Sequence, residues 1–275
     1  MAKGLGIIGN FKGKVGNIVG YNLKDSNNKQ TQGLRAYQPV VRNPKTSRQA
    51  EQRAKMAPIN ATYRALKGII DRGQEGVAYG NKSRLRFLSE AMKQFDGPWF
   101  EKGDAVTLPI KTNITKGSLP TVGCSVINTT DAYTNFVLGG SGDPTTVGDL
   151  TTRLLASNSF LKEGDQITFS HGKIGSVEIN SVLLDSASSE AVSIFKDGDG
   201  TLKLSFANAV DVDEAFCAII LSREGDNGQH LRSTTALTLS TSAASDTHYT
   251  SAAKDAAIES YMAANGNTDW PEEKL

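Results

Sequence analysis

The stretch from Val192 to Phe206, VSIFKDGDGTLKLSF, gives the clearest indication of the fold in this chain. Apolar and polar residues alternate on both sides of Lys-Asp-Gly-Asp-Gly, as they do in strands that bury one face. A short turn rich in Asp and Gly between two such runs predicts a β-hairpin. Asp-Gly-Asp-Gly also resembles the start of a calcium loop, but Thr201 and Leu202 stand where an EF-hand requires a third Asp or Asn and then a glycine. We therefore expect a hairpin turn here and not a calcium site.

Short runs of the same character fill most of the chain after about residue 104. They are rich in Val, Ile, Thr and Phe, are separated by turn residues, and include TVGCSVI, QITFSHGKIGSVEINSVLL and EAFCAIILSR. This spacing predicts an antiparallel β-sandwich of the immunoglobulin-like or jelly-roll-like kind. One helix is expected at about residues 146–155, with Leu150 and Leu154 facing inward, and the alanine-rich SAAKDAAIESYMAANGN predicts a C-terminal helix.

The first hundred residues have a different pattern. VGNIVGYNL and GLRAYQPVVR are extended runs separated by the polar KDSNNKQTQ, which predicts a β-hairpin or small sheet over residues 13–42. Thr46 or Ser47 then supplies an N-cap for a helix that has Ala50, Ala54 and Ala57 on one face. Pro58 lacks the N–H that a continuous helix uses, so we expect a kink or a restart there.

A further helix is expected before Pro98, and its apolar face is predicted to consist of Leu85, Leu88, Met92 and Phe95. We therefore expect an α+β protein in three parts. These are a basic hairpin-plus-helices region at 1–100, an acidic β-sandwich domain at 101–245, and a C-terminal helix and tail at 246–275.

The formal net charge of +1 hides a strong division along the chain. Residues 1–100 contain 18 Lys and Arg against 6 Asp and Glu, a net charge of +12, whereas the remaining residues contain 12 against 23, a net charge of −11. Such an asymmetry indicates a nucleic-acid contact or two regions that meet unlike neighbours.

The basic residues gather around the expected junction between strand and helix. A solvated basic face, contact with DNA phosphates, and contact with an acidic protein surface are all compatible with this cluster. The acidic region of a neighbouring copy of this chain would supply such a surface. The cluster comprises Arg35, Arg42, Lys45, Arg48, Arg53, Lys55, Arg64 and Lys67.

No motif for catalysis or for a cofactor withstands inspection. Gly4, Gly6 and Gly9 spell G-x-G-x-x-G, but too few residues precede them for the strand that a dinucleotide site requires. Ile8 and Val15 occupy positions where a phosphate-binding loop needs Gly and Ser or Thr. We therefore expect a protein that is not an enzyme and that holds no cofactor and no metal.

The cysteines, the histidines and the first residues of the chain likewise indicate no metal site, catalytic site or secretory signal. Cys124 and Cys217 fit no metal spacing and are expected to be small buried hydrophobic residues. The three histidines lie in three separate segments, and no two of the 29 acidic residues stand out as a catalytic pair. No apolar run approaches the length of a membrane helix, and Met-Ala-Lys-Gly does not begin like a secretory signal.

Two segments carry a resemblance to a known family. GKVGNIVGYNLKD at 13–25 and VVRNPKTSRQAEQRAKM at 40–56 resemble a family of uncharacterised proteins from Bacteroidetes genomes and their phages, which shares the pattern GKVGNxVGY followed by NPxTxxQxxqRxK. The resemblance covers about the first 95 residues. Many members pass quickly from YxxKG to the arginine strand, whereas this chain inserts DSNNKQTQGLRAY.

The resemblance implies a place in the virions of crAss-like gut phages, as a component of the tail or of rings near the portal. It brings no catalytic residues. It implies a protein made in the host cytoplasm and incorporated into the virion tail, with copies of itself, neighbouring tail or portal proteins and DNA in the tail lumen as partners, and no membrane.

Our first hypothesis is accordingly a structural virion protein that assembles into a ring. The alternatives are a non-catalytic binding module, such as a surface or carbohydrate-binding β-sandwich, and a hydrolase. The stretch from Gly4 to Tyr21 is expected to be an extended arm or hairpin that contacts other subunits, because glycine permits close approach of a second backbone. The residues expected to contact subunits or DNA are Gly13, Lys14, Gly16, Gly20, Tyr21, Arg35, Arg42, Arg48, Arg53 and Lys55.

Overall fold

The computed structural model describes residues 13–15, 17–24, 30–37, 46–126, 131–192, 194–196, 201–205, 209–225 and 228–264. Contacts divide the chain into two units, Met1–Pro44 and Lys45–Leu275, which are described separately below. Helices and antiparallel sheets both contribute, so the expected α+β class is confirmed. The division between the units lies at a different place from the boundary expected near residue 100.

The first unit contains one antiparallel sheet of three strands. Its strands follow one another in the order β1 (Gly13–Val15), β2 (Ile18–Lys24) and β3 (Gln30–Ala36). The register of β2 and β3 runs from Ile18 opposite Ala36 to Lys24 opposite Gln30. The predicted pairing of the two extended runs is therefore present, with β1 as an additional strand at the edge beside β2. Residues 25–29 and 38–42 of the predicted hairpin lie outside the described residues.

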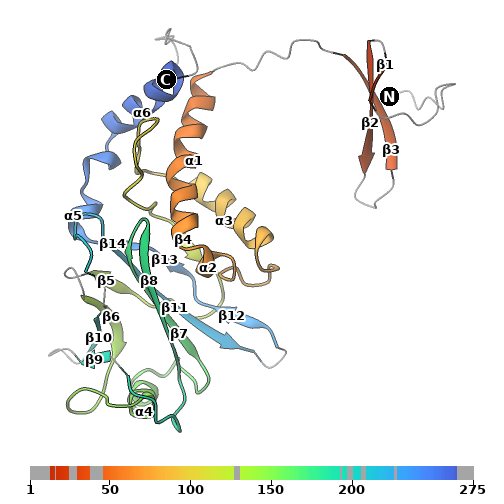
Figure 1. Ribbon diagram of the computed structural model, residues 1–275. Coiled ribbons are helices and arrows are strands. Elements are labelled where there is room, and N and C mark those ends of the chain that lie inside the picture. The colour runs from red at the N-terminus through yellow and green to blue at the C-terminus, as the bar shows by residue number, and fades with distance from the viewer. Residues whose placement is uncertain are drawn as a thin grey trace. The chain divides into compact units, whose positions relative to one another are not determined.

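A larger antiparallel sheet forms the middle layer of the second unit (Figure 1). Its main strand order is β12-β11-β7-β8, and β14 also pairs with β11. The strands are β7 (Gln166–Lys173), β8 (Ser176–Leu183), β11 (Phe216–Glu224), β12 (His230–Arg232) and β14 (Thr238–Leu239).

Strand β11 is buried on both of its faces over residues 216–222. Because side chains of a strand alternate between faces, its residues divide between two cores. Phe216, Ala218 and Ile220 join the core under the helices. The residues between and after them, Cys217, Ile219 and Leu221, join the core on the opposite face.

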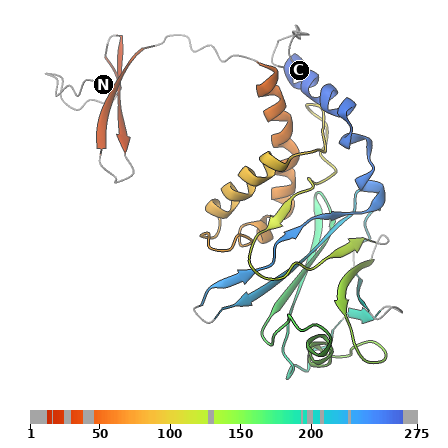
Figure 2. The ribbon, with the colours of Figure 1, turned by 180° about the vertical axis from the view of Figure 1, so that it is seen from behind.

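Helices cover the first of these faces. Figures 1 and 2 show α6 running beside α1, and α3 packed next to α1. Ala50 of α1 packs against Ile258 and Met262 of α6, so the C-terminal helix is anchored on the first helix of this unit. The helices are α1 (Ser47–Ala65), α2 (Lys67–Ile70), α3 (Asn81–Gln94) and α6 (Ser251–Ala263), and a two-stranded sheet of β4 (Asn113–Thr115) and β13 (Thr235–Ala236) lies with them.

A second antiparallel sheet and one helix cover the other face. The strand order is β5-β6-β10-β9, and α4 lies at the end of the unit away from the helical layer (Figure 2). Lys196 of β9 pairs with Leu202 of β10, which confirms the strand pairing predicted between Val192 and Phe206. The expected turn at residues 197–200 lies outside the described residues. The elements are β5 (Cys124–Val126), β6 (Asp131–Val137), β9 (Ile194–Lys196), β10 (Thr201–Ser205) and α4 (Val147–Ser157).

These two antiparallel sheets share one core, as expected for the predicted sandwich. Phe136 of β6 and Leu202 of β10 pack with Phe169 of β7 and with the alternate residues of β11. Leu154 of α4 closes this core, as the sequence pattern predicted, and Thr146 caps the helix by accepting a hydrogen bond from the Asp149 backbone N–H at 3.2 Å. The second unit therefore has three layers, with the larger sheet between the helices and the smaller sheet.

Two details of the helices differ from the expectation. Helix α1 begins after Thr46, as predicted, but it continues through Pro58 to Ala65 without a restart. Pro58 is buried, so packing compensates for the one helical hydrogen bond that its missing N–H removes. In α3 the buried face consists of Ser83, Phe87 and Ala91.

Leu85 was expected on that buried face but is 56% exposed, so this prediction was wrong. The buried face of α3 is rotated from the predicted one, because Ser83 can be buried. The Ser83 Oγ has a hydrogen-bond partner inside the fold, donating to the Ile70 carbonyl at 2.6 Å. Because Ser83 is polar, the apolar periodicity of the sequence does not indicate that its position is buried.

Candidate functional site

One face of the three-stranded sheet is apolar and exposed. Ile18 lies opposite Ala36, and Gly20 lies opposite Leu34, so all four residues share one face. Ile18 is 42% exposed and Leu34 is 56% exposed. We call these four residues the apolar face. Exposed clusters of large apolar side chains are typical of surfaces that bind a partner.

The opposite face of this sheet is cationic and aromatic. Val19 lies between Lys14 of β1 and Arg35 of β3, and Tyr21 lies opposite Gly33. The Tyr21 ring covers Gly33 so closely that a Cβ there would lie 2.6 Å from the ring Cζ. We call Lys14, Val19, Tyr21 and Arg35 the cationic face, and glycine at position 33 is what lets the tyrosine ring lie across the strand.

Tyr37, directly after β3, holds Lys14 in place. The Lys14 Nζ lies 3.4 Å from the centroid of the Tyr37 ring, a cation–π contact. The Tyr37 backbone N–H donates to the Asn17 carbonyl at 2.7 Å, which ties the end of β3 to the turn between β1 and β2. Tyr37 was not among the residues expected at this site, because the contact depends on strand pairing and not on a sequence motif.

Covering the apolar face of a small sheet stabilises it, because the apolar area is then removed from water. Both faces described above carry exposed side chains, and the predicted residues Gly13, Lys14, Gly20, Tyr21 and Arg35 all belong to this sheet. These five predicted residues therefore lie in one sheet. Gly16, Arg42, Lys45 and residues 4–12 of the expected arm lie outside the described residues.

The remaining predicted cations belong to α1 and have different surroundings. Arg48 and Arg53 are exposed. Lys55 is half-buried, and its Nζ lies 2.7 Å from the Glu51 carboxylate. The hydrogen bond from Lys55 lowers the pKa of Glu51 below its ordinary value, although burial opposes this. Lys55 therefore neutralises a charge of its own helix, whereas Arg48 and Arg53 are presented to solvent.

A groove of about 360 Å³ lies between α2 and the larger sheet. Arg72 and Arg232 contribute guanidinium groups, and Thr168, Ser181 and Ser222 contribute hydroxyls. The Arg232 Nη1 donates to the Ser222 Oγ, and its backbone N–H donates to the Glu75 carboxylate at 3.1 Å. These groups suit hydrogen bonding to a polar or anionic group, and no pattern in the sequence indicates that they meet.

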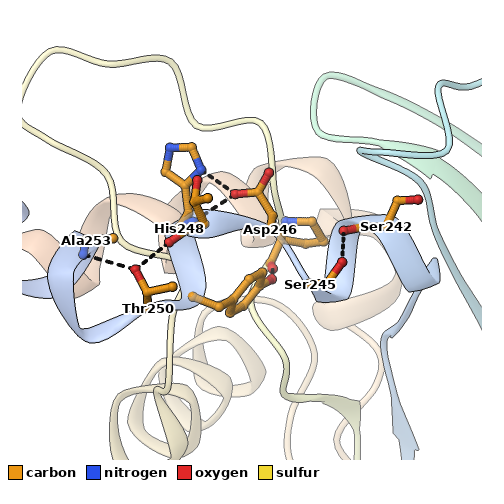
Figure 3. Close-up of polar contacts among 9 residues, drawn as sticks. Ser242, Ser245, Asp246, His248, Thr250 and Ala253 are labelled. Atoms are coloured by element: carbon orange, nitrogen blue, oxygen red, sulfur yellow. Dashed lines mark hydrogen bonds and ion pairs between the residues drawn. The ribbon is translucent and has the colours of Figure 1, made fainter.

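Asp246 and His248 form the contact that most resembles part of a catalytic site (Figure 3). The His248 Nδ1 lies 2.6 Å from the Asp246 Oδ1, and the Asp246 carboxylate also accepts the His248 backbone N–H at 2.8 Å. Although burial raises the pKa of Asp246, the hydrogen bonds from His248 outweigh it and leave this pKa below its ordinary value. An acid that orients an imidazole in this way is also found in hydrolases.

The hydroxyls near this pair are engaged in helix capping. The Ser245 Oγ donates to the Ser242 carbonyl at 3.0 Å, and the Thr250 Oγ1 accepts the Ala253 N–H at 3.3 Å (Figure 3). Asp246 itself caps η1 (Thr247–Tyr249), which links α5 (Thr241–Ala244) to α6. Asp246 and His248 therefore join three helical segments, and the contacts drawn in Figure 3 place no hydroxyl nucleophile on the imidazole.

The two cysteines lie together in the structure, which the sequence did not indicate. The Sγ atoms of Cys124 in β5 and Cys217 in β11 are 2.9 Å apart. Cys217 is buried as expected, whereas Cys124 is only half-buried. Within the described part of the chain, no group of three or more His, Cys, Asp and Glu side chains is arranged to hold a metal ion.

Comparisons of this chain with protein-family models, with curated proteins and with solved structures gave no match. Among the helices of the described residues, none combines the length and the apolar character needed to cross a membrane.

Proposed function

We propose that this protein is a structural component of a tailed-phage virion that assembles into a ring of the tail barrel or of the tail near the portal. The observation that carries the proposal is the three-stranded sheet, which belongs to a unit of its own and has exposed side chains on both faces. Such a sheet is stabilised when a partner covers it. The resemblance of its GKVGNIVGY segment to phage proteins supports a virion as the assembly in which the partner is found.

A second copy of the chain is the partner that the charges favour. A closed ring needs two unlike and complementary patches on each subunit. Residues 1–100 carry a net charge of +12 and the remainder carries −11, so each copy offers both signs. Lys14 and Arg35 of the cationic face, with Arg48 and Arg53 of α1, are exposed cations that would meet an acidic surface.

The apolar face gives the sharpest test of assembly. The double variant Ile18→Asp, Leu34→Asp should lower the mass of the wild-type oligomer to that of the monomer, because it places two charges on the surface that a neighbour covers. Native mass spectrometry and light scattering of the full chain measure this. Leu85→Asp on α3 is the matched control, since Leu85 is as exposed as Leu34 but lies outside the sheet.

Ionic strength and charge reversal test the electrostatic part. Arg48→Glu combined with Arg53→Glu should weaken assembly, and rising salt should weaken the wild-type oligomer in the same direction. Lys162→Glu, at an exposed position in the turn before β7, is the control. A wild-type chain that stays monomeric at every concentration, alone and with its native particle, would contradict the proposal. If the variant assembles normally but binds a DNA duplex more weakly, Arg48 and Arg53 would instead be assigned to the tail lumen.

A further inference from the structure

The thiols of Cys124 and Cys217 are the only two in the chain, and the fold brings them into contact. They are 93 residues apart in sequence, and their Sγ atoms are 2.9 Å apart. Cys124 begins β5 of the smaller sheet, and Cys217 is the second residue of β11 in the larger sheet. The pair therefore spans the interface between the two sheets.

The two thiols differ in their access to solvent. Cys217 is 1% exposed and belongs to the core between the sheets. Cys124 packs against the edge of this core and is half-buried. The hydrogen bond to Cys124, with burial, raises the pKa of the Cys217 thiol well above its ordinary value. A soluble reagent thus meets Cys124 first, and Cys217 is placed to react in a second step.

We propose that Cys124 and Cys217 are a modification site at which a small disulfide, such as oxidised glutathione, forms an intramolecular disulfide between the two sheets. The Cys124 thiolate attacks one sulfur of the reagent, so that a mixed disulfide forms and one glutathione thiolate leaves. The Cys217 thiolate then attacks the Cys124 sulfur and displaces the second glutathione. Two protein thiols are oxidised, one disulfide is reduced, and both protons end on the two glutathione thiols.

The bond would stabilise the second unit, because it closes a long loop that is open in the reduced unfolded chain. It would join β5 to β11, and so hold the smaller sheet on the strand that also carries the helical core. This inference is independent of the proposed virion function, since it depends on contacts within one chain.

The test compares the full-length protein after incubation with oxidised glutathione and with dithiothreitol. We expect a loss of both titratable thiols, a monomer lighter by the mass of two hydrogens, and a linked peptide pair containing Cys124 and Cys217. The midpoint of thermal unfolding should rise by roughly 5–15 °C in the oxidised protein. The reducing agent should reverse all of these changes.

Two variants separate the bond from other effects of oxidation. Cys124→Ser changes only the half-buried member of the pair and should abolish the rise in unfolding temperature on oxidation. Cys217→Ala should leave Cys124 with a stable mixed disulfide, because the second thiol that resolves it is gone. Two thiols that stay titratable in the oxidised wild type, a mixed disulfide that persists at Cys124 of the wild type, or linkage only between chains would each overturn the proposal.

Discussion

Arg223, near the end of β11, holds Asp165 through both oxygens of its carboxylate. The Arg223 Nε lies 2.6 Å from Oδ1, and Nη2 lies 2.7 Å from Oδ2. The Asp165 side chain is fully buried, and it also accepts the Lys162 backbone N–H at 2.8 Å. Arg223 further donates to the Phe160 carbonyl at 2.8 Å. This ion pair thus fixes the turn before β7 to the end of β11.

Replacing Asp165 tests how strongly the pair stabilises the second unit. Asp165→Asn removes the negative charge and leaves Arg223 largely buried, so the free energy of unfolding should fall by about 3 kcal/mol. Urea unfolding of the full chain measures this. The control is Glu214→Gln, which breaks the more exposed pair with Lys173 and should change the value by less than about 1 kcal/mol. Equal losses of unfolding free energy in Asp165→Asn and Glu214→Gln would contradict the conclusion that the buried pair with Arg223 stabilises the unit more strongly.

Ser233 supplies a side-chain acceptor in place of a backbone carbonyl along one edge of β11. Its Oγ accepts the Leu221 backbone N–H at 3.0 Å, and the Thr235 Oγ1 donates to the Ile219 carbonyl at 2.9 Å. Strand β12 pairs with β11 from Ser222 onward. Ser233→Ala leaves the Leu221 N–H unpaired in the core, so stability should fall by about 1–3 kcal/mol and that amide should exchange faster.

Thermal unfolding and hydrogen exchange would measure the Ser233 effect. Ser245→Ala is the comparison, since its exposed hydroxyl serves only the end of α5 and its removal should matter by less than about 0.5 kcal/mol. An unchanged rate of exchange at Leu221 in the Ser233 variant would show that another group takes over the hydrogen bond.

His171 makes the stability of the second unit depend on pH. It is buried in β7, and burial lowers its pKa below the ordinary value, although Glu178 and Asp131 act in the opposite direction. Below about pH 6.5 the unfolded chain binds a proton that the folded chain does not bind. The free energy of unfolding should therefore be greatest above this pH and should decrease as the pH falls toward the pKa of the folded state.

Urea unfolding between about pH 5 and pH 8 would reveal this dependence, above the range in which most carboxylates titrate. His171→Gln should flatten the curve over this interval, whereas the exposed His230→Gln variant should keep it. A slope that survives in His171→Gln would assign the dependence to another group.

Gly117 lies where two backbone segments approach closely. A Cβ at this position would overlap the Arg232 carbonyl oxygen, and backbone atoms cannot move aside as a flexible side chain can. Gly117→Ala should therefore lower the free energy of unfolding by about 1–3 kcal/mol. Gly68→Ala is the matched variant, because its added methyl group meets nothing within 4 Å and should leave stability unchanged or slightly higher. Comparable urea midpoints for the two variants would refute this account.

The parts of the fold that depend on local pattern were predictable. Thr46 offers the N-cap that helix α1 uses, and the pairing of β9 with β10 follows from alternating strands around an Asp- and Gly-rich segment. Predictions failed where tertiary packing outweighs local preference. Pro58 remains inside a helix because packing holds it there, and Ser83 occupies a buried position because the Ile70 carbonyl accepts its hydroxyl.

The residues of the candidate sites also divide into those that a local sequence pattern predicted and those that only the tertiary structure brings together. Lys14, Tyr21 and Arg35 lie on one small sheet. Lys14 and Tyr21 were singled out by the motif that carries the resemblance and Arg35 by the cluster of cations, whereas the register that makes them neighbours is known only from the structure. The contact between Cys124 and Cys217 was not predictable, since they are 93 positions apart in the sequence and only the packing of two sheets makes them neighbours. Pairs of this kind carry no local pattern from which their contact can be inferred.

The double burial of β11 has a practical consequence for dividing the protein into fragments. A fragment that lacks the helices would leave Phe216, Ala218 and Ile220 in water on one side of this strand. A deletion of one residue within the strand would exchange the residues of its two faces, and so disturb both cores at once. The helical layer and the smaller sheet should therefore be expressed together and should unfold together, because the cores of both layers include residues of β11.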